Sequence, residues 1–160
     1  VLEVHLRVRL VTDGKLGRRI LSDTSEAWER ETERIWSGNL ALVAGDRRWP
    51  IHLDLEFTND RPHHVVIVRD SRSRVDQLNW NRWTPPSAVA HEVGHMLGAF
   101  DEYAGGDLDP SSARVVKGTL MSADAARNPV PLPRHLPVLA QWAIDRVAAQ
   151  ARIEKIRGRQ

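Results

Sequence analysis

The stretch TPPSAVAHEVGHMLGAFDEY, residues 84–103, places two histidines and a glutamate at helical spacing. His91 and His95 are four residues apart, so on a helix both imidazoles leave the same face, one turn from each other. That spacing lets two nitrogens bind one Zn²⁺ ion. Glu92 is offset from the two histidines, where a glutamate can hold and deprotonate water without binding the metal.

A catalytic zinc site needs a third protein ligand and keeps its fourth position open. Gly98 can end the helix in a left-handed conformation and turn the chain back toward the metal. Asp101, six residues after His95, is then the candidate third ligand.

A second aspartate stays open as an alternative ligand. One arrangement of zinc ligands follows the histidine helix with Gly-Thr-x-x-Asp, and Gly118-Thr119 matches its start. The aspartate of that pattern would fall at Ser122, and Asp124 comes two positions later. Asp124 is therefore the alternative to Asp101.

The segment HEVGHMLGAFD, residues 91–101, resembles the metzincin pattern HExxHxxGxxH/D in its aspartate form. Leu120-Met121-Ser122 is similar to the Met-turn, which in metzincins passes beneath the metal. The aspartate with Tyr103 two positions later resembles the snapalysin group of small bacterial zinc endopeptidases. HExxHxxGxxDEY is also similar to metallopeptidase domains that bacteria carry as toxin modules.

The resemblance implies a zinc endopeptidase that hydrolyses peptide bonds with a metal-activated water. It implies that the Zn²⁺ ligands are His91, His95 and Asp101. Glu92 would be catalytic as the general base, and Tyr103 as a hydrogen-bond donor to the oxyanion. A plain packing role is the alternative for Tyr103.

The resemblance also implies a protein or peptide substrate and secretion or delivery outside the producing cell. For a toxin module it implies an inhibitor or immunity protein as a partner. The net charge is only +2 with scattered arginines, and no apolar run is long enough to span a membrane. We therefore expect a monomer without a nucleic-acid or membrane partner. The chain starts at Val1 without a signal peptide, so we expect a mature product or a domain of a longer protein.

Two other classes of function stay open. A zinc-binding but inactive recognition domain would keep the metal for stability, although such a site does not need Glu92 as a base. A basic nucleic-acid module would bind DNA in a strongly salt-dependent way, and the scattered arginines give it little support.

Composition agrees with one soluble domain over residues 1–160. Apolar residues make up 41% of the chain and charged residues 28%, which is ordinary for globular proteins. There is no cysteine, so disulfides and thiolate zinc ligands are excluded.

Alternating apolar and polar residues predict strands on both sides of the central stretch. The expected strands are 2–11, 40–43, 51–57 and 65–68, the last of them an apolar run buried on both faces. His52, Asp54 and Glu56 fall on the polar side of their strand, which favours a solvent-facing surface over a metal group. Residues 76–83 are a candidate edge strand, and the resemblance to metzincins implies that residues 78–80 line the substrate cleft. A plain packing role is the alternative for Trp80 and Trp83.

Three helices are expected. The first has its N-cap among Asp23, Thr24 and Ser25 and ends at Gly38. The second begins with Thr84 as N-cap and Pro85 in the first position. The third begins at Pro137 with one apolar face, formed by Leu139, Trp142, Ala143 and Val147. Residues 104–117 are expected to be a loop, and the basic tail from about residue 152 is expected to fray.

This order of elements predicts a metzincin-like α/β domain. Its expected core is a mostly parallel twisted sheet with one antiparallel edge strand. A packing helix, the helix that carries the histidines and a C-terminal helix complete the fold.

Overall fold

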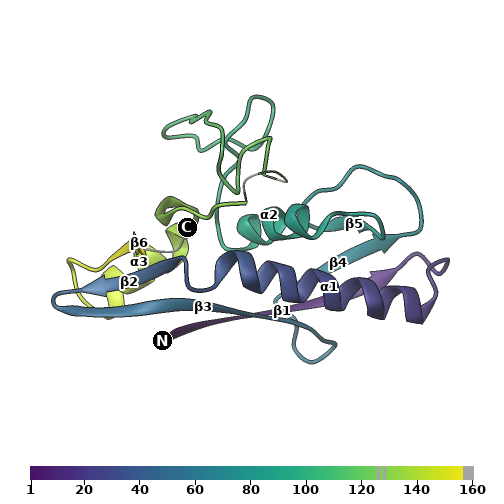
Figure 1. Ribbon diagram of the computed structural model, residues 1–160, viewed down its shortest axis with the longest axis horizontal. Coiled ribbons are helices and arrows are strands. Elements are labelled where there is room, and N and C mark those ends of the chain that lie inside the picture. The colour runs from purple at the N-terminus through teal and green to yellow at the C-terminus, as the bar shows by residue number, and fades with distance from the viewer. Residues whose placement is uncertain (126, 128, 157–160) are drawn as a thin grey trace.

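Six strands and three helices make up the computed structural model, which describes residues 1–125, 127 and 129–156 (Figure 1). The strands are β1 (Leu2–Thr12), β2 (Leu40–Ala44), β3 (Arg47–Phe57), β4 (His64–Arg69), β5 (Asn79–Asn81) and β6 (Arg152–Lys155). The helices are α1 (Arg18–Trp36), α2 (Pro86–Met96) and α3 (Pro137–Arg146), with a short 3₁₀ turn η1 (Pro133–His135). Among the described residues, no helix has the length and apolar character needed to cross a membrane.

All six strands join one mixed sheet in the order β5-β4-β1-β3-β2-β6. β1 lies between β3 and β4 and is parallel to both, and β5 extends the parallel part. β2 and β6 are antiparallel and form the other end of the sheet. The antiparallel edge strand expected at residues 76–83 is not found there, because β5 is parallel to β4. The antiparallel strands lie at the other end of the sheet, at β2 and β6.

The helices cover one face of the sheet, so β1, β3 and β4 bury alternate residues, whereas β2 buries four residues in succession, Leu40 to Val43. Val66 and Val68 of β4 are fully buried, whereas Val65 and Ile67, which alternate with them, are exposed. The prediction that residues 65–68 are buried on both faces is wrong for this reason. The strand pattern predicted for β1 and β3 is confirmed, with Leu6 and Leu53 buried on the covered face.

Two tryptophans of α1 hold α2 in place over the sheet. The indole N–H of Trp28 donates to the backbone oxygen of Thr84 at 2.9 Å, and that of Trp36 donates to Ala90 at 3.1 Å. The Trp28 ring also packs edge-on against Trp80, with ring centroids 5.3 Å apart. Trp80 is fully buried, so it is a core residue and does not line a cleft.

Two helix starts differ from the prediction. α1 begins at Arg18 with Gly17 as its N-cap, so Asp23 lies inside the helix. The first turns contribute Leu21 to the core, and this burial extends the helix beyond the polar residues that resemble a cap. α2 begins at Pro86, and the Thr84 hydroxyl instead accepts a hydrogen bond from the Asn81 backbone N–H at 3.0 Å.

The C-terminal part contains one confirmed boundary and two corrections. α3 begins at Pro137 as predicted, but Ala143 is the buried residue of its expected apolar face, and Trp142 and Val147 are exposed. The expected fraying tail contains β6, which pairs with β2 from Arg152 onward, while residues 157–160 lie outside the described residues. Residues 104–117 contain no helix and only an isolated bridge, as expected of a loop.

Candidate metal centre

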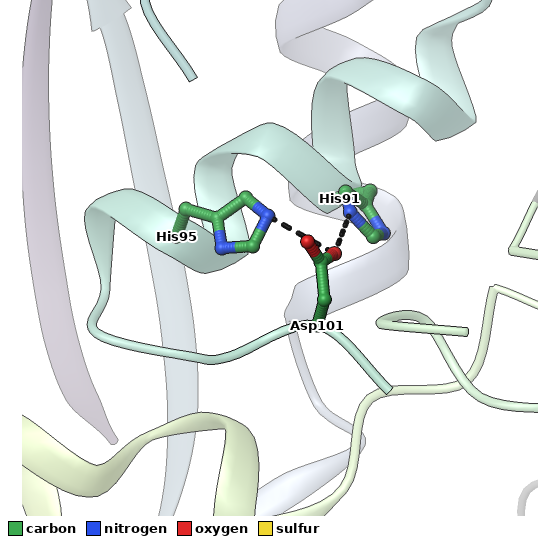
Figure 2. Close-up of side chains that lie close together, drawn as sticks. All are labelled: His91, His95 and Asp101. Carbon is green, nitrogen blue, oxygen red and sulfur yellow. Dashed lines mark hydrogen bonds and ion pairs between the residues drawn. The ribbon is translucent and has the colours of Figure 1, made fainter. Parts of the chain in front are cut away.

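Three side chains from α2 and the loop behind it point at one another: His91, His95 and Asp101 (Figure 2). Asp101 Oδ1 lies 3.0 Å from His91 Nε2 and 3.3 Å from His95 Nε2. His91 and Asp101 are buried, and His95 is nearly so. The structure thus brings together the three residues that the sequence predicts as ligands.

Backbone carbonyls fix the orientation of both imidazole rings. His91 Nδ1 lies 2.8 Å from the oxygen of Leu120, and His95 Nδ1 lies 2.9 Å from the oxygen of Ala99. A carbonyl can only accept, so each Nδ1 carries the proton. Each Nε2 of the neutral ring then has its lone pair directed toward Asp101, which is the tautomer that a metal-binding histidine needs.

The chain reaches Asp101 through a glycine turn. Gly98 has φ of +92°, a left-handed conformation that side chains disfavour, and a Cβ there would lie 2.7 Å from Val138 Cγ2. The second carboxylate oxygen of Asp101 accepts a hydrogen bond from the Asp107 backbone N–H at 2.7 Å. A Cβ on Gly106 would lie within 2.5–2.7 Å of the Asp101 side chain, so only glycine allows the loop to approach this closely.

The donor set fits a metal ion. Two nitrogen lone pairs and one carboxylate oxygen converge, and three such acceptors repel one another without a cation between them. Tetrahedral ligands at zinc bond lengths of 2.0–2.1 Å lie about 3.3 Å apart, which agrees with the 3.0 and 3.3 Å separations of these atoms. The group can therefore hold a metal ion with three protein ligands.

Charge and hydrogen bonding around the group favour an ionised aspartate. Burial raises the pKa of the Asp101 carboxyl, but its contacts with His91 and His95 and the hydrogen bond from the Asp107 N–H outweigh burial and hold the pKa well below its usual range. Burial lowers the pKa of His95, yet its contact with Asp101 raises it overall. The aspartate therefore supplies a negative charge that attracts a cation.

Glu92 is buried beside this group, with 8% of its surface exposed. Burial raises the pKa of its carboxyl, partly offset by the neighbouring His91 and His95. Within residues 1–125, 127 and 129–156, no side chain or backbone group donates a hydrogen bond or forms an ion pair to this carboxylate. Its oxygens are not among the fully enclosed unpartnered atoms of the described residues, so water can reach this carboxylate beside the metal group.

The segment predicted as a Met-turn lies against α2. Met121 is fully buried, and a Cβ on Gly94 would lie 2.5 Å from its sulfur. The neighbouring Leu120 supplies the carbonyl that orients His91. This segment therefore packs against the helix between the two histidines and contacts the site directly.

Two further predicted residues have different outcomes. Tyr103 lies near the site, with its ring centroid 6.2 Å from that of His91. Asp124 does not belong to the group, because its carboxylate accepts from the Gly118 N–H at 3.0 Å and from the Ser122 hydroxyl. These bonds cap the turn that begins at Gly118, so the alternative ligand assignment is wrong.

The sequence did not reveal the support around Asp101. Gly106 lacks a side chain where the Asp101 side chain lies, so the loop can pass close to it. Glu102, the residue after Asp101, accepts hydrogen bonds from Thr119 and Arg134 through its carboxylate. Gly105-Gly106 is a visible signal for a close approach, but no spacing rule connects Glu102 to residues 17 and 32 positions away.

Comparison of the chain with protein-family models, with curated proteins and with solved structures found no match.

Proposed function

We propose that the protein is a zinc-dependent endopeptidase. The observation that carries this proposal is Glu92, a buried carboxylate that has no partner among the described residues and stands beside His91, His95 and Asp101. A metal site that serves only stability has no use for such a group, whereas hydrolysis requires a base close to the metal.

The expected chemistry divides between the metal and the chain. A bound Zn²⁺ supplies Lewis acidity, which makes water a stronger acid and polarises the scissile carbonyl. Glu92 holds the attacking water, accepts its proton and later delivers a proton to the leaving amine. Burial raises the pKa of its carboxyl, which is the direction that makes the carboxylate a stronger base.

Tyr103 is proposed to donate a hydrogen bond to the oxyanion. Burial and the nearby charge of Asp101 raise the pKa of its phenol, so the hydroxyl stays protonated at neutral pH. A protonated hydroxyl can stabilise negative charge that develops on the carbonyl oxygen.

The resemblance to metzincins supports the same reading. The pattern His91 to Asp101, the left-handed Gly98 and the buried Met121 against α2 all accord with it. β5 departs from it, because it is parallel to β4. A peptide substrate that paired with β5 would therefore meet a strand direction different from the one the resemblance implies. Similarity to the snapalysin group and to toxin modules further suggests action outside the producing cell.

The test compares wild-type protein with Glu92→Gln at matched zinc loading. Glutamine keeps the shape but cannot accept the proton, so cleavage of casein or a peptide library should fall by about 10²–10⁴-fold. Zinc content and melting temperature should stay near wild type. Glu56→Gln on the exposed side of β3 is the matched control and should cleave normally. Chelators and hydroxamates should block wild-type cleavage.

Equal cleavage by wild type and Glu92→Gln would show that another site or a contaminant is responsible. A zinc-loaded wild type that cleaves none of the substrates would contradict a general endopeptidase and favour a recognition domain that binds metal.

A further inference from the structure

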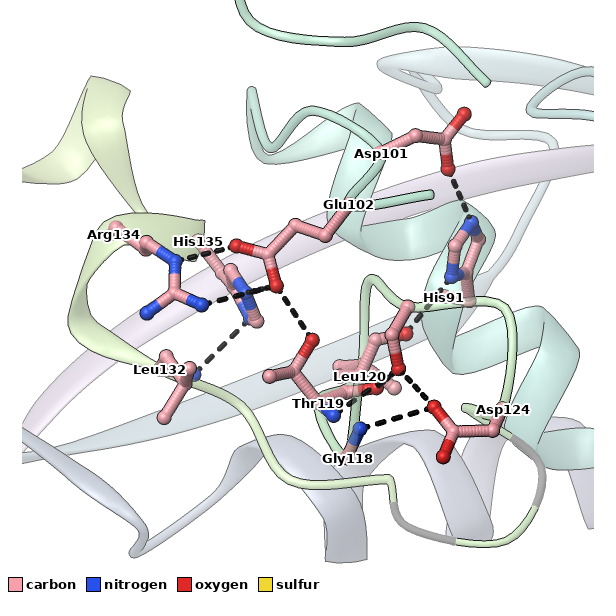
Figure 3. Close-up of polar contacts among 11 residues, drawn as sticks. His91, Asp101, Glu102, Gly118, Thr119, Leu120, Asp124, Leu132, Arg134 and His135 are labelled. Atoms are coloured by element: carbon pink, nitrogen blue, oxygen red, sulfur yellow. Dashed lines mark hydrogen bonds and ion pairs between the residues drawn. The ribbon is translucent and has the colours of Figure 1, made fainter. Parts of the chain in front are cut away.

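Glu102 follows the candidate ligand Asp101 directly and points away from the metal group (Figure 3). Its backbone lies between two loop segments: its N–H donates to the Met121 oxygen at 2.8 Å, and its oxygen accepts from the Val116 N–H at 3.0 Å. The residue is only 4% exposed. A carboxylate at such a position needs donors around it, because burying an unpaired charge costs several kcal/mol.

Donors from two later segments surround the carboxylate. The Thr119 hydroxyl donates to Oε2 at 2.6 Å, and the guanidinium of Arg134 donates to both oxygens, with Nη2 at 3.1 Å from Oε2. His135 accepts the Leu132 N–H on Nδ1, so its Nε2 carries a proton. That Nε2 lies 3.4 Å from Glu102 Oε2, close enough for attraction but not aligned as a hydrogen bond.

These contacts connect one candidate ligand to another by a short path. Asp101 is bonded to Glu102, Glu102 is tied to Thr119, and the next residue, Leu120, accepts the Nδ1 proton of His91. Leaving aside residues 126 and 128, which the structure does not describe, residues 97–132 contain no helix and no extended strand that could fix this distance by itself. The Glu102 carboxylate and the Glu102 backbone bond to Met121 therefore both tie the chain after Asp101 to the segment that orients His91.

We infer that Glu102 is a positioning residue of the metal site, which holds Asp101 and the Leu120 carbonyl in register through Thr119 and Arg134. The inference rests on the proposed metal site. Groups that orient metal ligands typically change metal affinity by about 10–100-fold when they are removed. Glu102 does not touch the ligand nitrogens, so its loss should loosen the site and leave all three ligands in the chain.

Paired variants separate this role from general packing. Glu102→Gln removes the charge that Arg134 pairs with, and Thr119→Val removes one hydroxyl at nearly constant volume. Thr119→Ser keeps that hydroxyl and serves as the conservative rescue. Glu154→Ala is the matched control, because it breaks an ion pair at the β6 edge of the sheet. In that pair Arg48 Nη1 lies 3.0 Å from Glu154 Oε2.

The measurements are Zn²⁺ affinity by competition with a chromophoric chelator and the visible absorption spectrum of the Co²⁺-loaded protein. Glu102→Gln and Thr119→Val should bind Zn²⁺ about 10–100-fold more weakly and shift the Co²⁺ bands. Thr119→Ser and Glu154→Ala should behave as wild type. Circular dichroism of the metal-free proteins checks that each variant is folded, and Thr119→Val carries the test if Glu102→Gln does not fold.

A folded Thr119→Val protein with wild-type affinity and an unchanged Co²⁺ spectrum would overturn the positioning role alone. A wild-type protein that binds no Zn²⁺ at one ion per chain would overturn the proposed function together with it.

Discussion

Two histidine–carboxylate contacts in this protein have similar lengths and opposite surroundings. On the open side of the sheet, His5 Nδ1 lies 2.6 Å from Asp54 Oδ2, with side-chain exposures of 59% and 49%. Behind α2, His91 Nε2 lies 3.0 Å from Asp101 Oδ1, with exposures of 10% and 7%.

The second contact of each histidine explains why only one pair belongs to a metal group. His5 turns its other nitrogen toward the exposed Glu3, 3.5 Å away. His91 donates from its other nitrogen to the buried backbone of Leu120. Water and mobile side chains weaken an exposed pair to about 0–1 kcal/mol, whereas a backbone carbonyl fixes the buried ring in one tautomer and one direction.

If burial and backbone support make this difference, removing the carboxylate of Asp101 or of Asp54 should affect Zn²⁺ affinity differently. Asp101→Ala removes a ligand and should lower Zn²⁺ affinity by more than the roughly 100-fold upper range for supporting residues. Asp54→Ala should leave the affinity unchanged. Chelator competition measures both, and full zinc occupancy in Asp101→Ala together with zinc loss in Asp124→Ala would refute the ligand assignment.

Acid should destabilise the folded protein through the buried His135. Burial lowers the pKa of His135 to about 4, against an ordinary value of 6.5. The folded state therefore resists protonation, so this stability is present above pH 6.5 and is lost as pH falls toward 4. The loss amounts to roughly 3 kcal/mol at pH 4.

Urea unfolding of chelator-treated protein measures this effect as the difference between wild type and His135→Asn. Asparagine can still accept from the Leu132 N–H but does not titrate. Relative to His135→Asn, wild type should lose roughly 3 kcal/mol of stability as pH falls from 6.5 to 4. A constant difference between wild type and His135→Asn over that range would contradict the prediction.

Gly94 and Met121 are closely packed under the metal group, so one added methyl group on Gly94 should lower the stability of the protein. Gly94→Ala would place Cβ 2.5 Å from the Met121 sulfur. Overpacking typically costs about 1–3 kcal/mol, and the higher helix propensity of alanine returns about 1 kcal/mol. We expect a net loss of up to about 2 kcal/mol by thermal or urea unfolding. In a Met121→Ala background the same change should no longer destabilise the protein.

The smallest effect is expected from replacing the sulfur itself. Met121→Leu nearly conserves volume and should cost less than about 1.5 kcal/mol, since Met121 packs against α2 and is not a ligand. Zinc content should remain at the wild-type level. Complete zinc loss from a folded Met121→Leu protein would mean that the methionine does more than pack.

The sequence predicted the local part of the site well, because helical spacing determines where His91 and His95 project. Gly98 has one conformation that suits a sharp return, so Asp101 could also be placed. The alternative at Asp124 could not be rejected from the sequence. Its exclusion depends on hydrogen bonds from Gly118 and Ser122 that form only when the turn closes.

Long-range features were harder to predict. The continuous apolar run of β4 predicts a strand but cannot say that helices cover one face only, which leaves Val65 and Ile67 exposed. Likewise, nothing in residues 152–155 identifies β2 as their partner more than 100 positions earlier. The hydrogen bonds from Thr119 and Arg134 to Glu102 are also tertiary contacts, which no local sequence pattern predicts.

The central place of β1 has a consequence for how the chain acquires its structure. Leu2 pairs with Ile51 and Val8 with His64. Both partner strands of β1, β3 and β4, therefore follow it in the chain, and β1 cannot pair before they are present. The β2–β3 pair is joined by a two-residue turn and can form early. Because parallel neighbours on both sides demand closure of long loops, we expect slow folding in which amides of β2 and β3 gain protection from hydrogen exchange before those of β1.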